Sequence, residues 1–480
     1  MTDHFAESSA SFTDWFKASQ PSLNPKIQLA DLRHLGKGRG IIAVQDLAQD
    51  EELFSVSRDR ILSTENSDFA KTPRGQELIT NLDDQWLSLI LVMIRESLMN
   101  EGSVWKPYFD VLPESFDTLM FWTEDELAEL QASSVRDKIG KTSADRMFTQ
   151  DLLPTIRSAP SHFPGVESLT DQDLLCLAHR MGSTIMAYAF DIEKRPSTQA
   201  QDEEGYVSDD EADFLPKGMI PMADMLNADA ALNNARLFYE ADTVSMRTLV
   251  PVKAGDELFN DYGPLPRADL LRRYGYITEN YAAYDVVEIA TDLVVTVVKG
   301  LKSTQQASLM TDAYLSEVAD ALSERGYHED AYDLACHSHS PDDDDESEPD
   351  DKPLFPPGLQ MLLYRLVVDN NDSPPPKKYA KKPAALSDEE RHAIANAYIA
   401  VLRARQAEYS TSIEQDRRIL ADLTPPQASS RKGVAIQVRL GEKLVLQRAL
   451  EHVWASGITQ SNGITGEEPS SKRLKTSNGI

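Results

Sequence analysis

The first residues that could carry chemistry form a glycine-rich loop, Gly36-Lys37-Gly38-Arg39-Gly40. Glycine lets backbone N–H groups approach a ligand closely, so such a loop is a candidate phosphate-binding site. A dinucleotide-binding fingerprint requires a helix after the glycines, and a P-loop requires Lys followed by Ser or Thr. Here residues 41–44 (IIAV) continue as a strand-like run. Taken alone, the loop is therefore interpreted as a tight turn.

A second candidate site combines the segment 218–228 (GMIPMADMLNA) with the segment 255–263 (GDELFNDYG). The later segment ends a strand-like run, and residues 264–274 after it have the pattern of a helix. Without further context, tyrosines that gather in such a unit are interpreted as a packed aromatic corner. The tyrosines of this turn and helix are Tyr262, Tyr274 and Tyr276.

A metal site could be suggested by the segment 336–339 (CHSH) beside the acidic run 342–345. Its spacing fits no common zinc pattern, and its surroundings are polar and aperiodic, so an incidental acidic loop is the better interpretation and no metal ligand is assigned. No Ser-His-Asp or Cys-His nucleophile can be selected from the sequence either. The two cysteines, Cys176 and Cys336, lie far apart, which excludes a disulfide framework and indicates a reducing compartment.

The elements that must position these residues begin with short strands, separated by Gly- or Asp-rich turns, between residues 26 and 63. From about Leu82 the apolar period becomes helical, and further helical segments follow around 123–132 and 171–190. Strand character then returns, so a helical insertion splits the β region. The expected strands are 27–29, 40–44, 52–56, 219–221, 235–239, 244–250 and 257–260.

After Tyr284 the chain is expected to be mainly helical. Its clearest helix opens with a capping box formed by Ser387 and Glu390, before a long run with helical apolar spacing. Polar or Pro- and Lys-rich stretches without apolar periodicity are expected to be irregular. These stretches are 194–213, 337–352, 372–385 and the tail 456–480.

The charge balance narrows the classes of partner. Lys plus Arg total 48 against 78 Asp plus Glu, a formal net charge of -30, which argues against nucleic acid or an anionic membrane and is compatible with a basic protein substrate. Fifteen of the acidic residues lie in 202–213 and 342–351, so half of the excess is consistent with solvated loops. No apolar run could span a bilayer and no secretory signal is evident at Met1, so we expect an intracellular protein.

Together, these motifs and their order resemble the SET methyltransferases of the Rubisco large-subunit methyltransferase type, and among them the fungal enzymes that methylate ribosomal proteins. The resemblance runs from about Lys26 to about Trp454. It implies an α+β fold, in which a β-rich SET domain with a helical insertion is followed by an all-α C-terminal substrate-binding domain. The implied boundaries are 20–80 and 215–284 for the two parts of the SET domain, 81–214 for the insertion with its acidic loop, 285–455 for the C-terminal domain with its two irregular inserts, and 456–480 for the tail.

The resemblance also implies cofactor-binding residues. The family's first cofactor loop falls on Lys37, Gly38 and Arg39, whose backbone would hold the amino-acid end of S-adenosylmethionine. The family's Asn-His pair falls on Asn227 and Ala228, so this chain departs from the usual histidine. Since that position is expected to act largely through its backbone, cofactor binding is still expected.

Further residues follow from the same resemblance. Tyr262 matches the active-site tyrosine and is expected to be catalytic and to contact the cofactor. Tyr188 stands where the Rubisco enzyme has an arginine and matches the tyrosine of the ribosomal and animal nuclear relatives, with a cofactor contact expected. The residues expected to contact the substrate are Trp105, Asp224, Tyr274 and Tyr276.

The implied reaction is methyl transfer to a lysine side chain, without a metal ion. A free lysine has a pKa of about 10.4, so roughly one in a thousand is deprotonated at neutral pH. An apolar aromatic channel beside a positive sulfonium lowers that pKa through desolvation and like-charge repulsion. The hydroxyl of Tyr262 would then orient the amine toward the methyl group.

The leading hypothesis is therefore an S-adenosylmethionine-dependent protein-lysine N-methyltransferase acting on a ribosomal protein, which the resemblance places in the large subunit. One alternative is a SET-derived module that has lost catalysis and binds a partner, which Ala228 favours. Another is a methyltransferase of a non-ribosomal nuclear protein. A nuclear location with a cytoplasmic fraction is expected from the basic clusters 377–382 and 472–475 and from the nuclear relatives.

Overall fold

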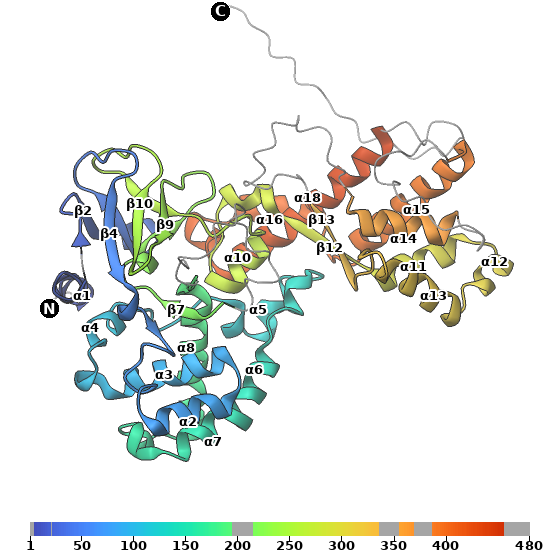
Figure 1. Cartoon of the computed structure of the whole chain (residues 1–480). Coiled ribbons are helices and arrows are strands. Elements are labelled where there is room, and N and C mark those ends of the chain that lie inside the picture. The colour runs from blue at the N-terminus through green and yellow to red at the C-terminus, as the bar shows by residue number, and fades with distance from the viewer. Residues whose placement is uncertain (1–3, 21, 194–214, 336–354, 369–385, 456–480) are drawn as a thin grey trace, which may run out of the picture. The chain divides into compact units, whose positions relative to one another are not determined.

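The computed structural model describes residues 4–20, 22–193, 215–335, 355–368 and 386–455 (Figure 1). The segments that we expected to be irregular, 194–213, 337–352, 372–385 and 456–480, lie outside the described residues. The CHSH segment and both basic clusters lie outside them too. The contacts between Cα atoms divide the chain into two compact units. Of the described residues, those up to Asp285 together with 414–441 form the first unit, and those between Val286 and Ile413 together with 442–455 form the second.

The chain opens with a helix, α1 (His4–Ser19), that the sequence analysis did not assign. Its aromatic residues recur at helical spacing, and Phe12 and Phe16 are completely buried. Phe16 packs edge-on against Phe54 with ring centroids 5.9 Å apart. The helix is therefore part of the core of the first unit, N-terminal to the boundary at residue 20 that the resemblance implied.

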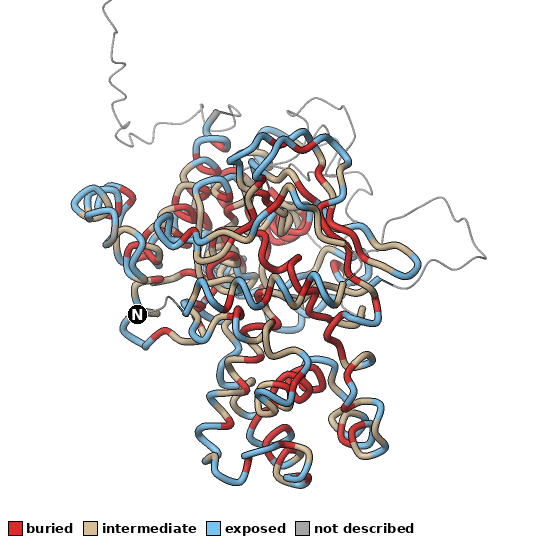
Figure 2. The backbone as a smooth tube through the Cα atoms, turned by 90° about the vertical axis from the view of Figure 1, so that its left-hand side faces the viewer, coloured by how far each residue is buried: buried red, intermediate tan, exposed pale blue. Residues whose placement is uncertain are grey.

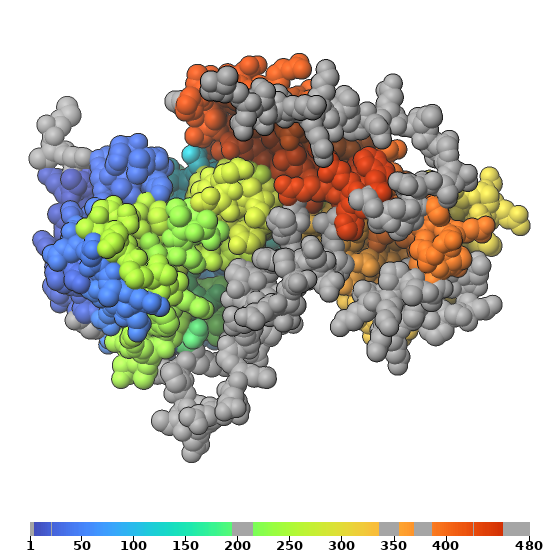
Figure 3. Space-filling view, turned by 90° about the horizontal axis from the view of Figure 1, so that it is seen from above, coloured from blue at the N-terminus to red at the C-terminus, as the bar shows by residue number. Residues whose placement is uncertain are grey.

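Two four-stranded sheets form most of the β region, with strand orders β1-β4-β10-β9 and β2-β3-β11-β8. Val56 pairs with Val244, and Ile42 pairs with Glu257. Segments far apart in the sequence, blue and green in Figure 3, thus lie side by side. The strands are β1 (Ser22–Leu23), β2 (Ile27–Asp31), β3 (Arg39–Ala43), β4 (Glu52–Ser57), β8 (Asn227–Ala228), β9 (Ala235–Tyr239), β10 (Thr243–Thr248) and β11 (Glu257–Asn260).

Most strand pairs in the two sheets are antiparallel, and the pairing of β8 with β11 is parallel. Asn227 lies opposite Phe259, and the N–H of Asp229 donates to the carbonyl of Asn260 at 3.1 Å. This pairing places Asn227 beside the strand that leads directly to Tyr262. A third sheet, β5-β7-β6, consists of β5 (Leu62–Ser63), β6 (Ala189–Asp191) and β7 (Lys217–Met219).

The helical insertion between the two parts of the β region is confirmed. Its core is α3, in which every residue from Leu87 to Ile94 is buried, and α8 packs against it. These buried stretches are red in Figure 2. A capping box of Thr170 and Asp173 starts α8, which ends at Tyr188. The helices are α2 (Pro73–Leu82), α3 (Gln85–Met99), α4 (Lys106–Phe109), α5 (Glu124–Ala128), α6 (Lys141–Met147), α7 (Leu153–Arg157) and α8 (Asp171–Tyr188).

The remaining chain is mainly helical, and the capping box of Ser387 and Glu390 is present. One feature was not expected: β12 (Val286–Ala290) and β13 (Ala331–Ala335) form an antiparallel pair. The α+β fold class, a β-rich domain with a helical insertion followed by helices, is confirmed. The helices are α10 (Arg267–Tyr274), α11 (Thr291–Leu301), α12 (Thr304–Leu309), α13 (Asp312–Ser323), α14 (Pro357–Val367), α15 (Asp388–Ala407), α16 (Ile413–Asp422), α17 (Pro425–Ala428) and α18 (Arg431–Ala455).

Candidate active site

The three tyrosines of the turn and helix after β11 do gather in space. Tyr262 and Tyr274 stack with ring centroids 4.1 Å apart and planes inclined by 10°. Tyr276 meets the ring of Tyr274 edge-on, at 6.4 Å. Between them, Gly275 ends α10 in a left-handed conformation, and a Cβ there would lie 2.9 Å from the backbone of Asp117. Glycine at this position allows the chain to turn so that both tyrosines reach Tyr262.

The surroundings of these tyrosines disfavour charge. Burial raises the pKa of Tyr262 well above its ordinary value, and the neighbouring phenols of Tyr276, Tyr274 and Tyr188 act in the same direction. Burial also raises the pKa of Tyr188 and that of Tyr274 to about 12. The phenols therefore keep their protons at physiological pH. The same poor solvation would lower the pKa of a lysine that enters among them.

Asp224 lies in a short 3-10 turn, Ala223–Met225, directly before β8, and is 7% exposed. One of its oxygens, Oδ2, accepts a short hydrogen bond from the hydroxyl of Tyr108. Its other oxygen, Oδ1, is buried and has no hydrogen-bond partner among the described residues. Burial raises the pKa of Asp224 to about 7, although the bond from Tyr108 lowers it. Since Asp224 also raises the pKa of Tyr188, the carboxyl belongs to the same poorly solvated region.

The backbone before Asp224 is strained. Met222 has φ 76° and ψ -37°, a conformation that residues with a side chain rarely adopt. Such a conformation costs on the order of 1–3 kcal/mol and persists only where the surrounding structure imposes it. Residues 219 to 226 around it are all buried, which supplies that constraint. The strain is therefore found where the chain positions Asp224 and Asn227.

The glycine-rich loop forms a tight turn, as expected from its sequence alone, with Gly36 and Gly38 at φ of 76° and 73°. The N–H of Leu32 donates to the carbonyl of Gly38 at 2.7 Å. The Nδ2 of Asn227 donates to the carbonyl of Arg39 at 3.2 Å. The structure thus joins the loop to Asn227, which is 188 residues further along the chain. Among the described residues, none donates to the carbonyl of Lys37.

The side chains of the loop point in two directions. The guanidinium of Arg39 donates to Ser8, Ser9 and the carbonyl of Val111, and it lies over the ring of Phe5 at 3.9 Å. Those contacts are with α1 and the segment after α4. The ammonium of Lys37 instead pairs with Glu257 at 2.7 Å. The backbone of Arg39, through its carbonyl, is thus the part of this residue that contacts Asn227. The expected contact of the loop backbone with the cofactor stays a prediction.

Ala228 and Trp105, two further residues that the resemblance implied, are connected to the site through backbone pairing and through other side chains. Ala228 is 5% exposed and pairs with Asn260, so its backbone is held by the parallel strand pair. Trp105 precedes α4 and packs against Trp15 of α1, with ring centroids 5.7 Å apart. It also contacts Tyr108 edge-on at 6.3 Å. Trp105 thus reaches the site through Tyr108 and Asp224, and its substrate contact stays a prediction.

Two residues of the site were missed by the sequence analysis. Tyr108 contacts Asp224, and Glu257 accepts from Asn227 Nδ2 at 2.7 Å. Glu257 lies in the candidate segment 255–263, and Tyr108 is three residues after Trp105. The sequence carried no signal for their contacts, because the partners lie 116 and 30 residues away.

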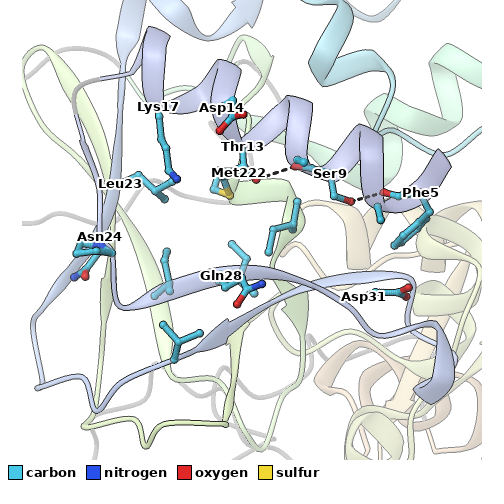
Figure 4. A pocket seen from close by; sticks show the side chains of 17 residues that line it. Phe5, Ser9, Thr13, Asp14, Lys17, Leu23, Asn24, Gln28, Asp31 and Met222 are labelled. Atoms are coloured by element: carbon cyan, nitrogen blue, oxygen red, sulfur yellow. Dashed lines mark hydrogen bonds between the residues drawn. The ribbon is translucent and has the colours of Figure 1, made fainter. Parts of the chain in front are cut away.

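A groove of about 670 Å³ lies outside this tyrosine site, between α1 and the β2–β3 hairpin (Figure 4). Ser9 and Thr13 of α1 face Gln28 of β2 across it, and Met222 lies behind them. None of the expected site residues lines the groove. Among the described residues, no three His, Cys, Asp or Glu side chains could hold a metal ion together. No helix within the described ranges has the length and apolar character to span a membrane.

Two family models match this chain, and both methyltransferases and solved structures are similar to it. The SET domain profile matches residues 38–263, and the Rubisco LSMT substrate-binding profile matches residues 358–446. Ribosomal lysine N-methyltransferase 4 of Saccharomyces cerevisiae is 33% identical over 310 residues, 63% of this chain and 61% of that protein. The matched region thus spans less than two thirds of that relative. The mouse N-lysine methyltransferase SETD6 is 26% identical over 459 residues, which cover 92% of this chain and 90% of that protein.

Among solved structures, Rubisco LSMT bound to AdoMet has a TM-score of 0.65 at 20% identity, and the match covers 94% of this chain and 93% of the other. At that identity the match shows the fold alone. The expected resemblance is confirmed: the chain contains a SET domain followed by a Rubisco LSMT substrate-binding domain, and it has the fold of Rubisco LSMT.

Proposed function

We propose that this protein transfers methyl groups from S-adenosylmethionine to the side-chain amines of lysines in a protein substrate. The observation that carries the proposal is the parallel pairing of β8 with β11. Asn227 of β8 is hydrogen-bonded to the glycine-rich loop, and Tyr262, stacked on Tyr274, closely follows the end of β11. S-adenosylmethionine supplies a methyl group that its sulfonium has already activated. The chain must then bind, orient and desolvate the reacting groups, and no metal ion is needed.

The residues present fit that cofactor. Asn227 Oδ1 accepts no hydrogen bond from a described residue, and neither does the carbonyl of Lys37. Two acceptors without partners suit the ammonium of the cofactor's amino-acid end. Gly36 and Gly38 have no atom within 4 Å of where a Cβ would be, so the loop is open on that side. Alanine at 228 leaves this backbone arrangement intact, which supports an active enzyme over a module that has lost catalysis.

The tyrosines would hold the substrate lysine. Their burial disfavours an ammonium, and a buried neutral amine can be oriented by the hydroxyl of Tyr262. The unpartnered Oδ1 of Asp224 would hold a donor of the substrate close by. Deprotonation of the lysine thus relies on exclusion of water and on the neighbouring positive charge, and each of these favours the neutral amine.

The experiment is to incubate the full chain with tritiated S-adenosylmethionine and isolated ribosomal subunits, and to follow label in protein bands that survive nuclease treatment. Label that depends on the protein, and is lost with Tyr262→Phe, supports the proposal. Binding of S-adenosylhomocysteine with no label in any protein fraction would favour the binding-module alternative. Absence of any cofactor binding would overturn the proposal.

For the substrate, we propose a ribosomal protein of the large subunit. The relatives named Ribosomal lysine N-methyltransferase 4 support a ribosomal substrate, and the net charge of -30 supports a basic one. The similarity to SETD6 proteins, which are named N-lysine methyltransferases without reference to the ribosome, keeps a non-ribosomal substrate as the second candidate. Large subunits, small subunits and nuclear extract, each offered separately, distinguish these substrates. Label confined to nuclear extract would contradict the ribosomal proposal.

For location, we propose the nucleus with a cytoplasmic fraction. The support is the sequence of the basic clusters 377–382 and 472–475, which lie outside the described residues. A fluorescent fusion with both clusters changed to alanine would be compared with the unmodified fusion in living cells. Equal distributions would exclude the clusters as the signal, and an unmodified fusion found only in the cytoplasm would contradict the location.

A further inference from the structure

Glu257, the first residue of β11, bridges two segments of the proposed cofactor site. Its Oε2 accepts from the ammonium of Lys37 at 2.7 Å, and its Oε1 accepts from Nδ2 of Asn227 at 2.7 Å. The Glu257 side chain is 11% exposed, compared with 38% for that of Lys37. A largely buried carboxylate thus connects the glycine-rich loop to β8.

These contacts determine how the amide of Asn227 is oriented. The amide nitrogen has two hydrogens, and both are used, one on Glu257 Oε1 and one on the carbonyl of Arg39 at 3.2 Å. Rotating the amide by 180° would lose both bonds and place its oxygen against a carboxylate and a carbonyl. Oδ1 of Asn227 must therefore point away from Glu257, where it accepts no bond from a described residue.

Gly40 makes this close approach possible. A Cβ at Gly40 would lie 2.9 Å from Nδ2 of Asn227, 3.0 Å from Oε1 of Glu257 and 2.5 Å from a methyl group of Leu32. Contacts this short mean that a side chain at position 40 would displace these neighbours. Packing therefore favours glycine at position 40, whether or not the loop contacts a ligand.

We propose that Glu257 is a positioning residue for cofactor binding: it fixes the amide of Asn227 so that Oδ1 faces the ammonium of the amino-acid end of S-adenosylmethionine. This inference rests on the proposed function. The carboxylate acts through Asn227 and does not touch the cofactor. Lys37 neutralises the carboxylate, so the site keeps an acceptor without an excess negative charge. A neutral amide at position 257 would accept a weaker hydrogen bond and would no longer oppose rotation of Asn227.

The test compares two ligands that differ at the amino-acid end. S-adenosylhomocysteine carries the ammonium, and 5′-methylthioadenosine lacks the whole amino-acid end. For Glu257→Gln in the full chain, we expect the Kd for S-adenosylhomocysteine to rise on the order of tenfold, as for the loss of one charge-assisted hydrogen bond, with the Kd for 5′-methylthioadenosine unchanged in calorimetry. The matched control is Glu240→Gln, which removes a carboxylate paired with Arg247 at 2.5 Å outside the site. It should alter neither Kd.

A double variant tests the route through Asn227. If Glu257 acts only through Asn227, Asn227→Ala with Glu257→Gln binds S-adenosylhomocysteine as Asn227→Ala alone does. If Glu257→Gln does not fold, Asn227→Ala must still lose affinity for S-adenosylhomocysteine and keep its affinity for 5′-methylthioadenosine. Equal weakening of both ligands, or additive losses in the double variant, would overturn the positioning role. An unaltered protein that binds neither ligand would overturn the proposed function and this inference with it.

Discussion

Tyr262 and Tyr274 stack at 4.1 Å although one follows a strand and the other ends the next helix. The stack depends on the fold of residues 263–274, which return the chain to the end of β11. The ring of Tyr274 holds the ring of Tyr262 in this plane, and the direction of the Tyr262 hydroxyl follows from it. A hydroxyl with a fixed direction is suited to orient a substrate, so its removal should slow methyl transfer.

Tyr262→Phe is expected to preserve the fold and cofactor affinity and to reduce turnover on the order of 10- to 100-fold, because small errors in the alignment of reacting atoms are costly. Methyl transfer at saturating cofactor measures the effect, and calorimetry with S-adenosylhomocysteine measures affinity. Tyr314→Phe, in α13, removes a hydroxyl that donates to the carbonyl of Arg365 and serves as the control. Turnover equal to that of the parent would exclude Tyr262 as the orienting residue.

Asp224→Asn is expected to stabilise the protein in a pH-dependent way. Burial raises the pKa of Asp224 to about 7, whereas an unfolded chain has a value of about 3.9. The folded protein therefore holds the proton more tightly, and the stability that Asp224 contributes is present below about pH 4 and is lost as the pH rises to about 7. Asparagine avoids this loss. The difference in Tm between the variant and the parent should be near zero at pH 4 and reach several degrees at pH 8. Each kcal/mol of unfolding free energy corresponds to a shift in Tm of about 2–4 °C.

Asp46→Asn is the control for that experiment. The hydrogen bond from Lys253 lowers the pKa of Asp46, an exposed carboxyl, so any stability it contributes is present above its unfolded pKa and is lost on acidification. Its substitution should give no gain in Tm at pH 8. A difference for Asp224→Asn that does not change between pH 4 and pH 8 would show that this carboxyl does not titrate as described.

Phe12→Ala is expected to destabilise the first unit by about 3–5 kcal/mol, because it removes a fully buried ring of α1. The ring packs at 6.0 Å from that of Tyr108, so the loss should also weaken the support of Asp224. Urea unfolding measures the effect. Phe238→Ala, at a side chain that is 38% exposed, should cost much less. Equal effects of the two substitutions would mean that α1 does not pack on the core.

Gly40→Ala is expected to weaken binding of S-adenosylhomocysteine and to destabilise the fold by about 1–3 kcal/mol, the usual effect of overpacking. The added methyl group would meet Asn227, Glu257 and Leu32. In the control, Gly300→Ala in α11, nothing lies within 4 Å of the new Cβ, and a small gain in helix stability is expected. Unchanged affinity and stability for Gly40→Ala would contradict the tight approach at this position.

The sequence by itself determined the local elements, since their signals are short-range. Strands 235–239 and 257–260 have the predicted bounds, and the capping box of Ser387 and Glu390 starts α15 as expected. Each of these depends on residues a few positions apart, where propensity and apolar period act. The helix α1 had such a signal in Phe12, Trp15 and Phe16, and it was overlooked.

The tertiary structure alone decided which side chains meet. The parallel pairing of β8 with β11, the bond from Tyr108 to Asp224 and the bridge through Glu257 each join residues 30 or more positions apart. The antiparallel pair β12–β13 is of the same kind. No local pattern encodes such contacts, because they become favourable only once burial of the whole core has compensated the entropy lost in bringing distant segments together.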